Sequence, residues 1–213
     1  MIKAIIFDYD GVIVDSFSTV FSVYQTICRE MGVALPESEI KFRTLYHRSY
    51  WELYGDLGIK DDDKAKANQI FRREVVTKDP QLFVGLKELI SELSQRFDLF
   101  IVSSNLILEI EEKVKKHGLS PYFKKIIGDI GSERFFKSDG IKSILEQENI
   151  LPSEAVYIGD RTIDYIAAER AGLDLNHILL VDYGWGYDKN LIKVNYNIKK
   201  PQDLIKVINN LNV

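Results

Sequence analysis

The start of the chain constrains the fold most strongly. Four apolar residues, Ala4–Phe7, have the length and β-branched content of a buried central strand. Asp8 and Asp10 follow at once, and Gly11 lets the backbone turn without a Cβ penalty. In open α/β sheets, ligands bind beyond the carboxyl ends of the strands. A buried strand that delivers paired carboxylates therefore predicts an active site at this edge of a sheet.

Length and composition allow one sizeable core, or a core with a smaller inserted domain. The chain has 213 residues, of which 46% are hydrophobic and 28% charged, and its formal net charge is -4. This mild acidity gives no electrostatic footprint for nucleic acid or an anionic membrane. A single cysteine excludes an internal disulfide, and no apolar run reaches membrane-spanning length. We expect a cytoplasmic protein that acts on a small molecule, with monomer and homodimer both open.

Strands alternate with helices in the second half of the chain. After a strand at 98–102, the apolar runs predict strands at 125–128, 155–159 and 177–181, with helices at 106–117, 138–148, 162–171 and 201–211. This alternation predicts an α/β fold, a Rossmann-like doubly wound parallel sheet.

A helical segment separates the first two predicted strands. Apolar residues between Phe17 and Met31 recur at helical spacing, and Gly32 ends that helix. A simple βαβ crossover takes about 30 residues, far fewer than lie between Phe7 and Asp98. The sequence thus predicts a core of residues 1–16 and 81–213 and an inserted helical domain of residues 17–80.

Polar residues gather where the predicted strands end. Asp8 and Asp10 follow the first strand, Ser103–Asn105 follow the second, and Asp160 follows a later one. Because the carboxyl ends of parallel strands meet at one edge, these side chains should converge. Lys137, just before a predicted helix, is placed to reach the same pocket.

These residues resemble the four motifs of the haloacid dehalogenase-like (HAD) hydrolase superfamily, in its phosphatase branch. The stretch DYDGVIVDS from Asp8 to Ser16 is similar to the first motif, and GDRTID from Gly159 to Asp164 is similar to the last. Ser103 and Lys137 stand in the order of the two motifs between them. A helical insertion directly after the first motif resembles the cap domain of phosphoglycolate phosphatases and β-phosphoglucomutases. The resemblance implies a HAD-like core with an inserted cap.

Several carboxylates in one cleft would repel an anionic phosphate, and a hard divalent cation removes that problem. The resemblance implies Mg²⁺ as the cofactor, held by side-chain oxygens of Asp8 and Asp160 and by the backbone carbonyl of Asp10. Asp164 would tune or orient the metal shell. As an acid in the first turn of a helix, Asp164 also has a purely structural explanation.

The resemblance further implies a role for each remaining motif residue. Asp8 would attack phosphorus and form an aspartyl-phosphate, and Asp10 would serve as general acid and base. Ser103 would donate its hydroxyl to the phosphoryl group, while Lys137 would hold Asp8 ionised. Lys142 is a second candidate for this lysine, weakened by its place inside the helix.

Substrate-binding candidates come from two places. Ser104 and Asn105 adjoin Ser103, and Arg43, His47 and Arg48 form a basic cluster among aromatic residues of the insertion. That cluster could bind a carboxylate or a second phosphate, or simply be solvated surface.

The leading hypothesis is a magnesium-dependent phosphatase acting on a small phosphorylated metabolite, such as phosphoglycolate or a sugar phosphate. One alternative is a phosphotransferase like β-phosphoglucomutase, although such enzymes carry a histidine twelve residues after the nucleophile, where this chain has Val20. Another is a catalytically retired binding protein on the same fold, which would not need Asp10 and Lys137.

Overall fold

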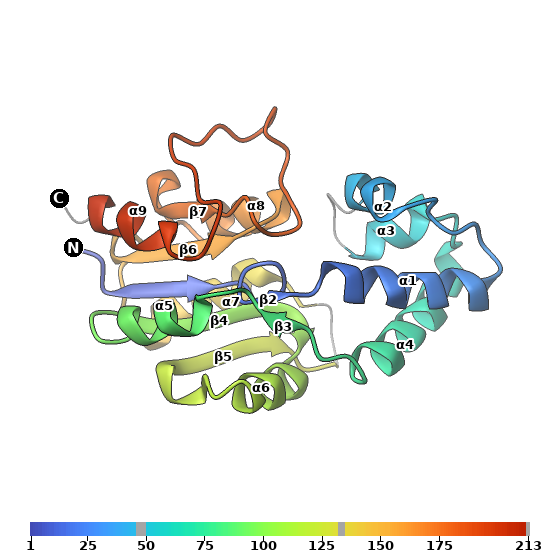
Figure 1. The fold of residues 1–213 in the computed structure, drawn as a ribbon, viewed down its shortest axis with the longest axis horizontal. Helices are drawn as coiled ribbons and strands as arrows, with labels where there is room; N and C mark the ends of the chain where they lie inside the picture. Colours follow the sequence, from blue (N-terminus) through green and yellow to red (C-terminus); the bar gives the residue numbers. More distant parts are fainter. Residues whose placement is uncertain (46–49, 132–134, 212–213) are drawn as a thin grey trace. The chain divides into compact units, whose positions relative to one another are not determined.

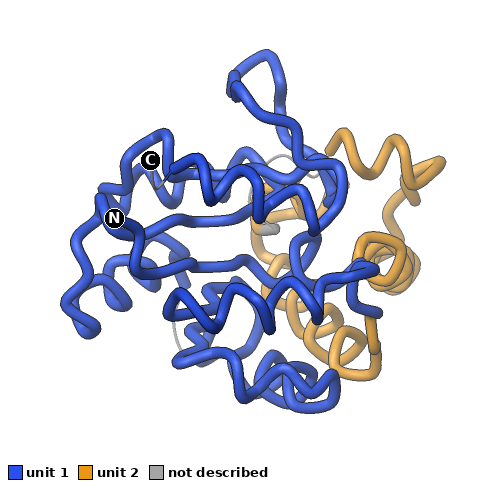
Figure 2. The backbone as a smooth tube through the Cα atoms, turned by 60° about the vertical axis from the view of Figure 1, so that its left-hand side comes forward, with its two compact units in different colours: residues 1–15, 81–213 blue, residues 16–80 orange. Residues whose placement is uncertain are grey.

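The structure is a computed structural model that describes residues 1–45, 50–131 and 135–211 (Figure 1). The chain divides into two compact units, residues 1–15 with 81–213 and residues 16–80 (Figure 2). Among the described residues, none of the helices has both the length and the apolar content needed to cross a membrane.

The larger unit is built on a five-stranded parallel sheet in the order β5-β4-β1-β6-β7. β1 (Ala4–Phe7) lies at its centre and all four of its residues are buried. The other strands are β4 (Asp98–Leu106), β5 (Phe123–Asp129), β6 (Ala155–Gly159) and β7 (Ile178–Leu180). The predicted doubly wound parallel sheet is confirmed.

Helices cover both faces of this sheet, and the alternation of β1 shows how (Figure 1). Ile5 and Phe7 pack on the side of α5 (Leu86–Leu93), α6 (Ile107–Lys116) and α9 (Asp203–Leu211). Ala4 and Ile6 face the side of α7 (Lys137–Gln147) and α8 (Thr162–Arg170). Because successive side chains of a strand point to opposite faces, a strand buried on both sides has a continuous apolar sequence. Short 3-10 helices precede three strands: η2 (Ser120–Tyr122), η3 (Pro152–Glu154) and η4 (Leu175–His177).

β4 is longer than its sequence predicts. The apolar run ends at Val102, but the strand continues to Leu106, which pairs with Asp129 of β5 after a register shift. The prediction that Ser103–Asn105 follow the strand is therefore wrong, because they lie within its irregular last part. Ladder pairing with β5, and not side-chain polarity, sets where the extended backbone ends.

The larger unit also contains a two-stranded antiparallel ribbon that the sequence does not predict. β2 (Val14–Asp15) pairs with β3 (Gln81–Leu82), so the points where the chain leaves and re-enters the larger unit lie side by side. Strands of two residues are too short to show any periodicity.

The smaller unit consists of helices: α1 (Phe17–Met31), α2 (Glu39–Leu45), α3 (Tyr50–Asp56), η1 (Asp61–Asp63) and α4 (Lys64–Val75). Its core is aromatic. The buried ring of Phe42 lies 5.0 Å from that of Tyr24 and 5.3 Å from that of Phe21. Gly32, in the left-handed conformation, ends α1 as expected.

Candidate active site

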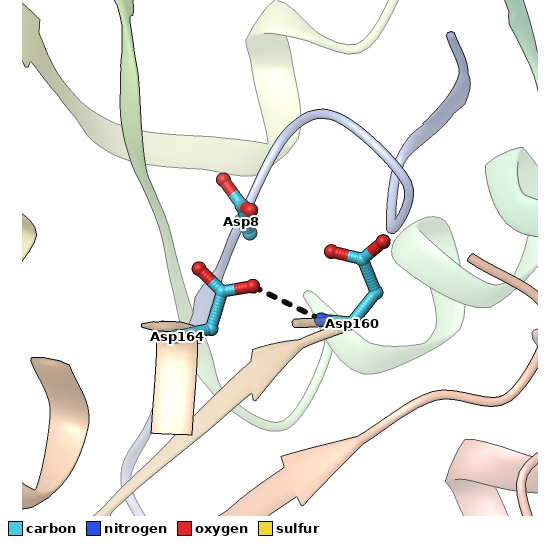
Figure 3. A group of neighbouring side chains, drawn as sticks. All are labelled: Asp8, Asp160 and Asp164. Atoms are coloured by element: carbon cyan, nitrogen blue, oxygen red, sulfur yellow. Dashed lines mark hydrogen bonds between the residues drawn. The ribbon is translucent and has the colours of Figure 1, made fainter. Parts of the chain in front are cut away.

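Three buried carboxylates meet beyond the carboxyl ends of the central strands (Figure 3). Asp8 follows β1 and is 3% exposed, while Asp160 follows β6 and is fully buried. Asp164 comes from the first turn of α8. One oxygen of each side chain lies within 4.8 Å of the others. The fold thus brings the first and last motifs into a single acidic group.

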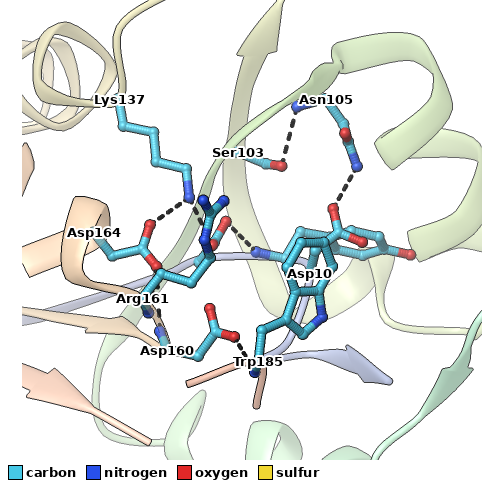
Figure 4. A network of polar contacts seen from close by, with 10 residues as sticks. Asp10, Ser103, Asn105, Lys137, Asp160, Arg161, Asp164 and Trp185 are labelled. Atoms are coloured by element: carbon cyan, nitrogen blue, oxygen red, sulfur yellow. Dashed lines mark hydrogen bonds and ion pairs between the residues drawn. The ribbon is translucent and has the colours of Figure 1, made fainter. Parts of the chain in front are cut away.

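Lys137, the first residue of α7, supplies the positive charge of this group (Figure 4). Its Nζ lies 2.6 Å from Oδ2 of Asp8 and 2.5 Å from Oδ1 of Asp164. Lys142 is exposed on the same helix. Of the two lysine candidates, Lys137 is the one that the structure places in the acidic group.

The two oxygens of Asp164 have different partners: one accepts backbone N–H groups and the other pairs with Lys137. Its Oδ2 accepts hydrogen bonds from the backbone N–H groups of Asp160 (3.2 Å) and Arg161 (2.9 Å), as expected of an acid in the first turn of a helix. Its Oδ1 accepts from Lys137. Asp164 therefore fixes both the lysine and the backbone that carries Asp160.

Asp10 lies beside this group and has its own partner (Figure 4). The side-chain amide of Asn105 donates to Oδ2 of Asp10, and the backbone N–H of Asn105 donates to Oγ of Ser103 at 3.2 Å. Ser103 is buried, whereas Ser104, the next residue of β4, is exposed on the other side of the strand. Ser103 and Asn105 are thus connected to Asp10 by hydrogen bonds, whereas the side chain of Ser104 lies on the other side of the strand.

The predicted basic cluster of the insertion is described only in part. The Arg43 guanidinium in α2 lies 3.9 Å from the ring centroid of Phe17, within the same unit. His47 and Arg48 lie outside the described residues.

Burial dominates the electrostatics of the acids. Desolvation raises the pKa of Asp8 to about 7, and Asp164 adds to this rise while Lys137 opposes it. Desolvation, with the charges of Asp164 and Asp8, holds the pKa of Asp160 well above its ordinary value. The metal-free site therefore retains protons on carboxyl groups that would be ionised in water.

For Lys137 and Asp164, the charge of the partner outweighs burial, so both pKa values shift in the direction that favours the charged form. Burial alone would lower the pKa of Lys137, but Asp164 and Asp8 outweigh it and raise that pKa. Burial would likewise raise the pKa of Asp164, yet the charge of Lys137 holds it below the ordinary value. Lys137 and Asp164 form a firm ion pair, whereas Asp8 and Asp160 have raised pKa values because the buried group has too little positive charge to stabilise two further carboxylates.

This imbalance fits a divalent cation. Oδ1 of Asp160 is buried and accepts no hydrogen bond within the described part of the chain, whereas Oδ2 accepts the backbone N–H of Trp185 at 2.5 Å. A buried carboxylate oxygen without a partner is costly unless it binds a donor or a metal. Hard cations prefer such oxygens. The residues present fit a divalent metal at Asp8 and Asp160.

The backbone of Gly184 and Trp185 also belongs to this site, although neither residue lies in a sequence motif. Both residues follow β7, whose carboxyl end lies at the same edge of the sheet as that of β6. The only available signal was the pair of glycines around Trp185, which stand four and six residues after the end of β7.

We expect the stability of the metal-free protein to fall as pH rises from about 4 to 7. The folded-state pKa of Asp8 is about 7, above its ordinary 3.8, so its contribution is fully present below pH 3.8 and is lost as pH rises through 7. Calorimetric melting in chelator checks this, and added Mg²⁺ should raise the Tm more at pH 8 than at pH 5. A Tm shift from Mg²⁺ that is independent of pH would contradict it.

Comparisons with known proteins agree with this geometry. A sequence profile of the haloacid dehalogenase-like hydrolase family matches residues 5–178. A phosphoglycolate phosphatase from Synechococcus elongatus is 28% identical over 216 residues, covering 98% of each chain. One from Aquifex aeolicus is 27% identical over 220 residues, covering 98% of this chain and 97% of its own.

Solved structures show the same relationship. A haloacid dehalogenase-like family hydrolase from Streptococcus pneumoniae has a TM-score of 0.85 and 25% identity, and the match covers 97% of this chain and 98% of that one. The family profile spans all four motifs, from Asp8 to Asp164. The chain therefore belongs to the haloacid dehalogenase-like hydrolase family, as its motifs predicted, and is an enzyme of the phosphatase branch.

Proposed function

We propose that this phosphatase hydrolyses a small phosphorylated metabolite with Asp8 as nucleophile and Mg²⁺ as cofactor. The observation that carries the proposal is the pairing of two buried groups, Asp8 and Lys137, 2.6 Å apart at the end of the central strand. A carboxylate among buried acids resists ionisation, and Lys137 lowers its pKa. Lys137 thus favours the ionised form of Asp8 that a nucleophile needs, and a bound cation would favour it further.

Asp8 and Asp160 would hold the metal through side-chain oxygens, and Asp10 through its backbone carbonyl. When bound, Mg²⁺ neutralises charge on the phosphoryl oxygens. Oδ1 of Asp164 is paired with Lys137 and Oδ2 with the backbone, so we propose that Asp164 orients this shell from behind.

The protein's own residues carry both chemical steps. The Asp8 carboxylate attacks phosphorus and the bond to the ester oxygen breaks, while that oxygen takes a proton from Asp10. Water then attacks phosphorus of the aspartyl-phosphate and gives a proton to Asp10. The bond between the Asp8 oxygen and phosphorus breaks, which releases phosphate and restores the Asp8 carboxylate. The amide of Asn105 orients the Asp10 carboxyl group. Since Oγ of Ser103 accepts the Asn105 N–H, its own O–H can be directed to a phosphoryl oxygen.

We propose that residues 1–16 and 81–213 form the catalytic core. Residues 17–80 form a cap domain that selects the substrate. The relatives named as phosphoglycolate phosphatases favour a substrate with a carboxylate close to its phosphate. Arg43 and Arg48 supply cations, and His47 a ring N–H donor, of the kinds that bind carboxylates.

A mutase has less support, because position 20 holds a buried valine in α1, which cannot exchange a proton.

The test is turnover of a substrate panel by the purified protein, with Mg²⁺ and with chelator. We expect Mg²⁺-dependent phosphate release, with kcat/KM for phosphoglycolate or a sugar phosphate about ten-fold or more above that for p-nitrophenyl phosphate. Conversion of a sugar phosphate into its isomer without net phosphate release would indicate a mutase. Absence of turnover on every ester, in protein shown to be folded, would contradict the proposal.

A further inference from the structure

The segment 183–188, which follows β7, lies against Asp160 at the heart of the candidate metal site (Figure 4). The backbone N–H of Trp185 donates to Oδ2 of Asp160 at 2.5 Å, and both residues are buried. The other oxygen of Asp160, Oδ1, accepts no hydrogen bond from the residues that the structure describes. A main-chain donor thus distinguishes two otherwise equivalent oxygens.

The backbone of this segment lies so close to Asp160 that neither Gly184 nor the facing Gly11 has room for a side chain. A Cβ at Gly184 would lie 2.3 Å from the carbonyl oxygen of Gly11, 2.4 Å from Cβ of Asp160 and 2.6 Å from its Oδ2. A Cβ at Gly11 would lie 2.1 Å from the same Oδ2. Gly11 also has φ of 75°, which favours glycine, whereas Gly184 lies outside that region. Gly184 is therefore required for space and not for backbone conformation.

Both ends of the segment are anchored to catalytic loops. The Tyr183 hydroxyl donates to the carbonyl oxygen of Val12 at 3.2 Å, in the turn of the first motif. The backbone N–H of Asp188 donates to Oγ1 of Thr162 at 2.9 Å, at the start of α8. Segment 183–188 thus bridges the turn after Asp8 and the loop that carries Asp160.

We propose that segment 183–188 is the positioning element of the metal site: the Trp185 N–H holds Oδ2 of Asp160 so that Oδ1 alone binds the cation. This inference rests on the proposed metal-dependent function and assigns it residues outside the four motifs. A carboxylate fixed before binding loses no rotational freedom when the cation arrives. Groups that orient a ligand in this way typically change metal affinity by about 10–100-fold.

Gly184→Ala tests the proposal because the added methyl must push the segment away from Asp160. We expect the Mg²⁺ Kd of the chelator-stripped protein to rise about ten-fold or more, measured by calorimetric titration. Trp185 fluorescence in a Trp51→Phe background, which leaves Trp185 as the sole tryptophan, gives a second measure of binding. Excess Mg²⁺ should restore kcat with an unchanged KM for the ester.

Gly55→Ala is the matched control, since Gly55 has an ordinary φ and its Cβ would come no nearer than 3.6 Å to any neighbour. Its Mg²⁺ Kd should equal that of the wild type. If Gly184→Ala does not fold, Tyr183→Phe decides, because it removes one anchoring hydroxyl and keeps the ring that packs on Phe83. We expect its Mg²⁺ Kd to rise about two- to five-fold.

Wild-type Mg²⁺ affinity in folded Gly184→Ala, or in Tyr183→Phe where the former does not fold, would overturn the inference while leaving the phosphatase intact. Wild-type protein that binds Mg²⁺ but hydrolyses no ester would overturn only the proposed function, and the comparison of Kd values would still test the positioning role.

Discussion

Asp8→Asn is expected to abolish turnover, lowering kcat by about 10³-fold or more, because an amide oxygen cannot form the aspartyl-phosphate. The variant should still fold. Asparagine has nearly the same size, and its oxygen can accept the Tyr9 N–H that Oδ1 of Asp8 accepts at 2.7 Å. Without metal, the variant should be destabilised less than the wild type at high pH, because it lacks one buried acid that ionises there.

Phosphate release and intact-protein mass spectrometry after acid quench check this expectation. Wild-type protein should show a phosphorylated species during turnover, and the variant should show none. Asp98→Asn is the matched control: it lies at the start of β4, at the opposite end of the sheet, and pairs with the exposed Lys124. Turnover by Asp8→Asn within about ten-fold of the wild type would reject Asp8 as nucleophile.

Lys137→Met should damage both activity and stability. The lysine side chain is 9% exposed and faces Asp8 and Asp164, so its loss leaves buried carboxylates without a cation. Removing one partner of a buried ion pair costs about 3–5 kcal/mol, or about 10 °C in Tm for a chain of this size. We expect kcat/KM to fall about 10²–10³-fold, since a charge facing the reacting group is lost.

Melting curves at two pH values distinguish the loss of the ion pair from the loss of side-chain packing as the cause of the lower Tm. The loss of Tm should be smaller at pH 5.5 than at pH 8, because a protonated Asp8 needs no cation. Lys142→Met, a change on the exposed side of the same helix, should leave Tm and kcat/KM near wild type. Equal effects of both substitutions would show that Lys137 has no special role.

Local sequence determined where the five strands of the main sheet and most helices lie, and the order of the motifs. β1 and β6 have the predicted bounds, because an apolar run bounded by polar residues fits a strand buried on both faces. Such a run also fixes where its carboxyl end lies, so Asp8 and Asp160 could be placed at one edge of the sheet from their neighbours alone. The acidic character of the site follows from those two positions.

Only the tertiary structure decided which groups touch. Periodicity could not choose firmly between Lys137 and Lys142, since the choice depends on which end of α7 points at Asp8. It could not find the end of β4, which pairing with β5 sets. Nor could it find the Trp185 N–H beside Asp160, because every residue except proline carries that donor and side-chain patterns do not record where it points. Contacts between distant backbone segments arise from packing, and packing is a property of the whole chain.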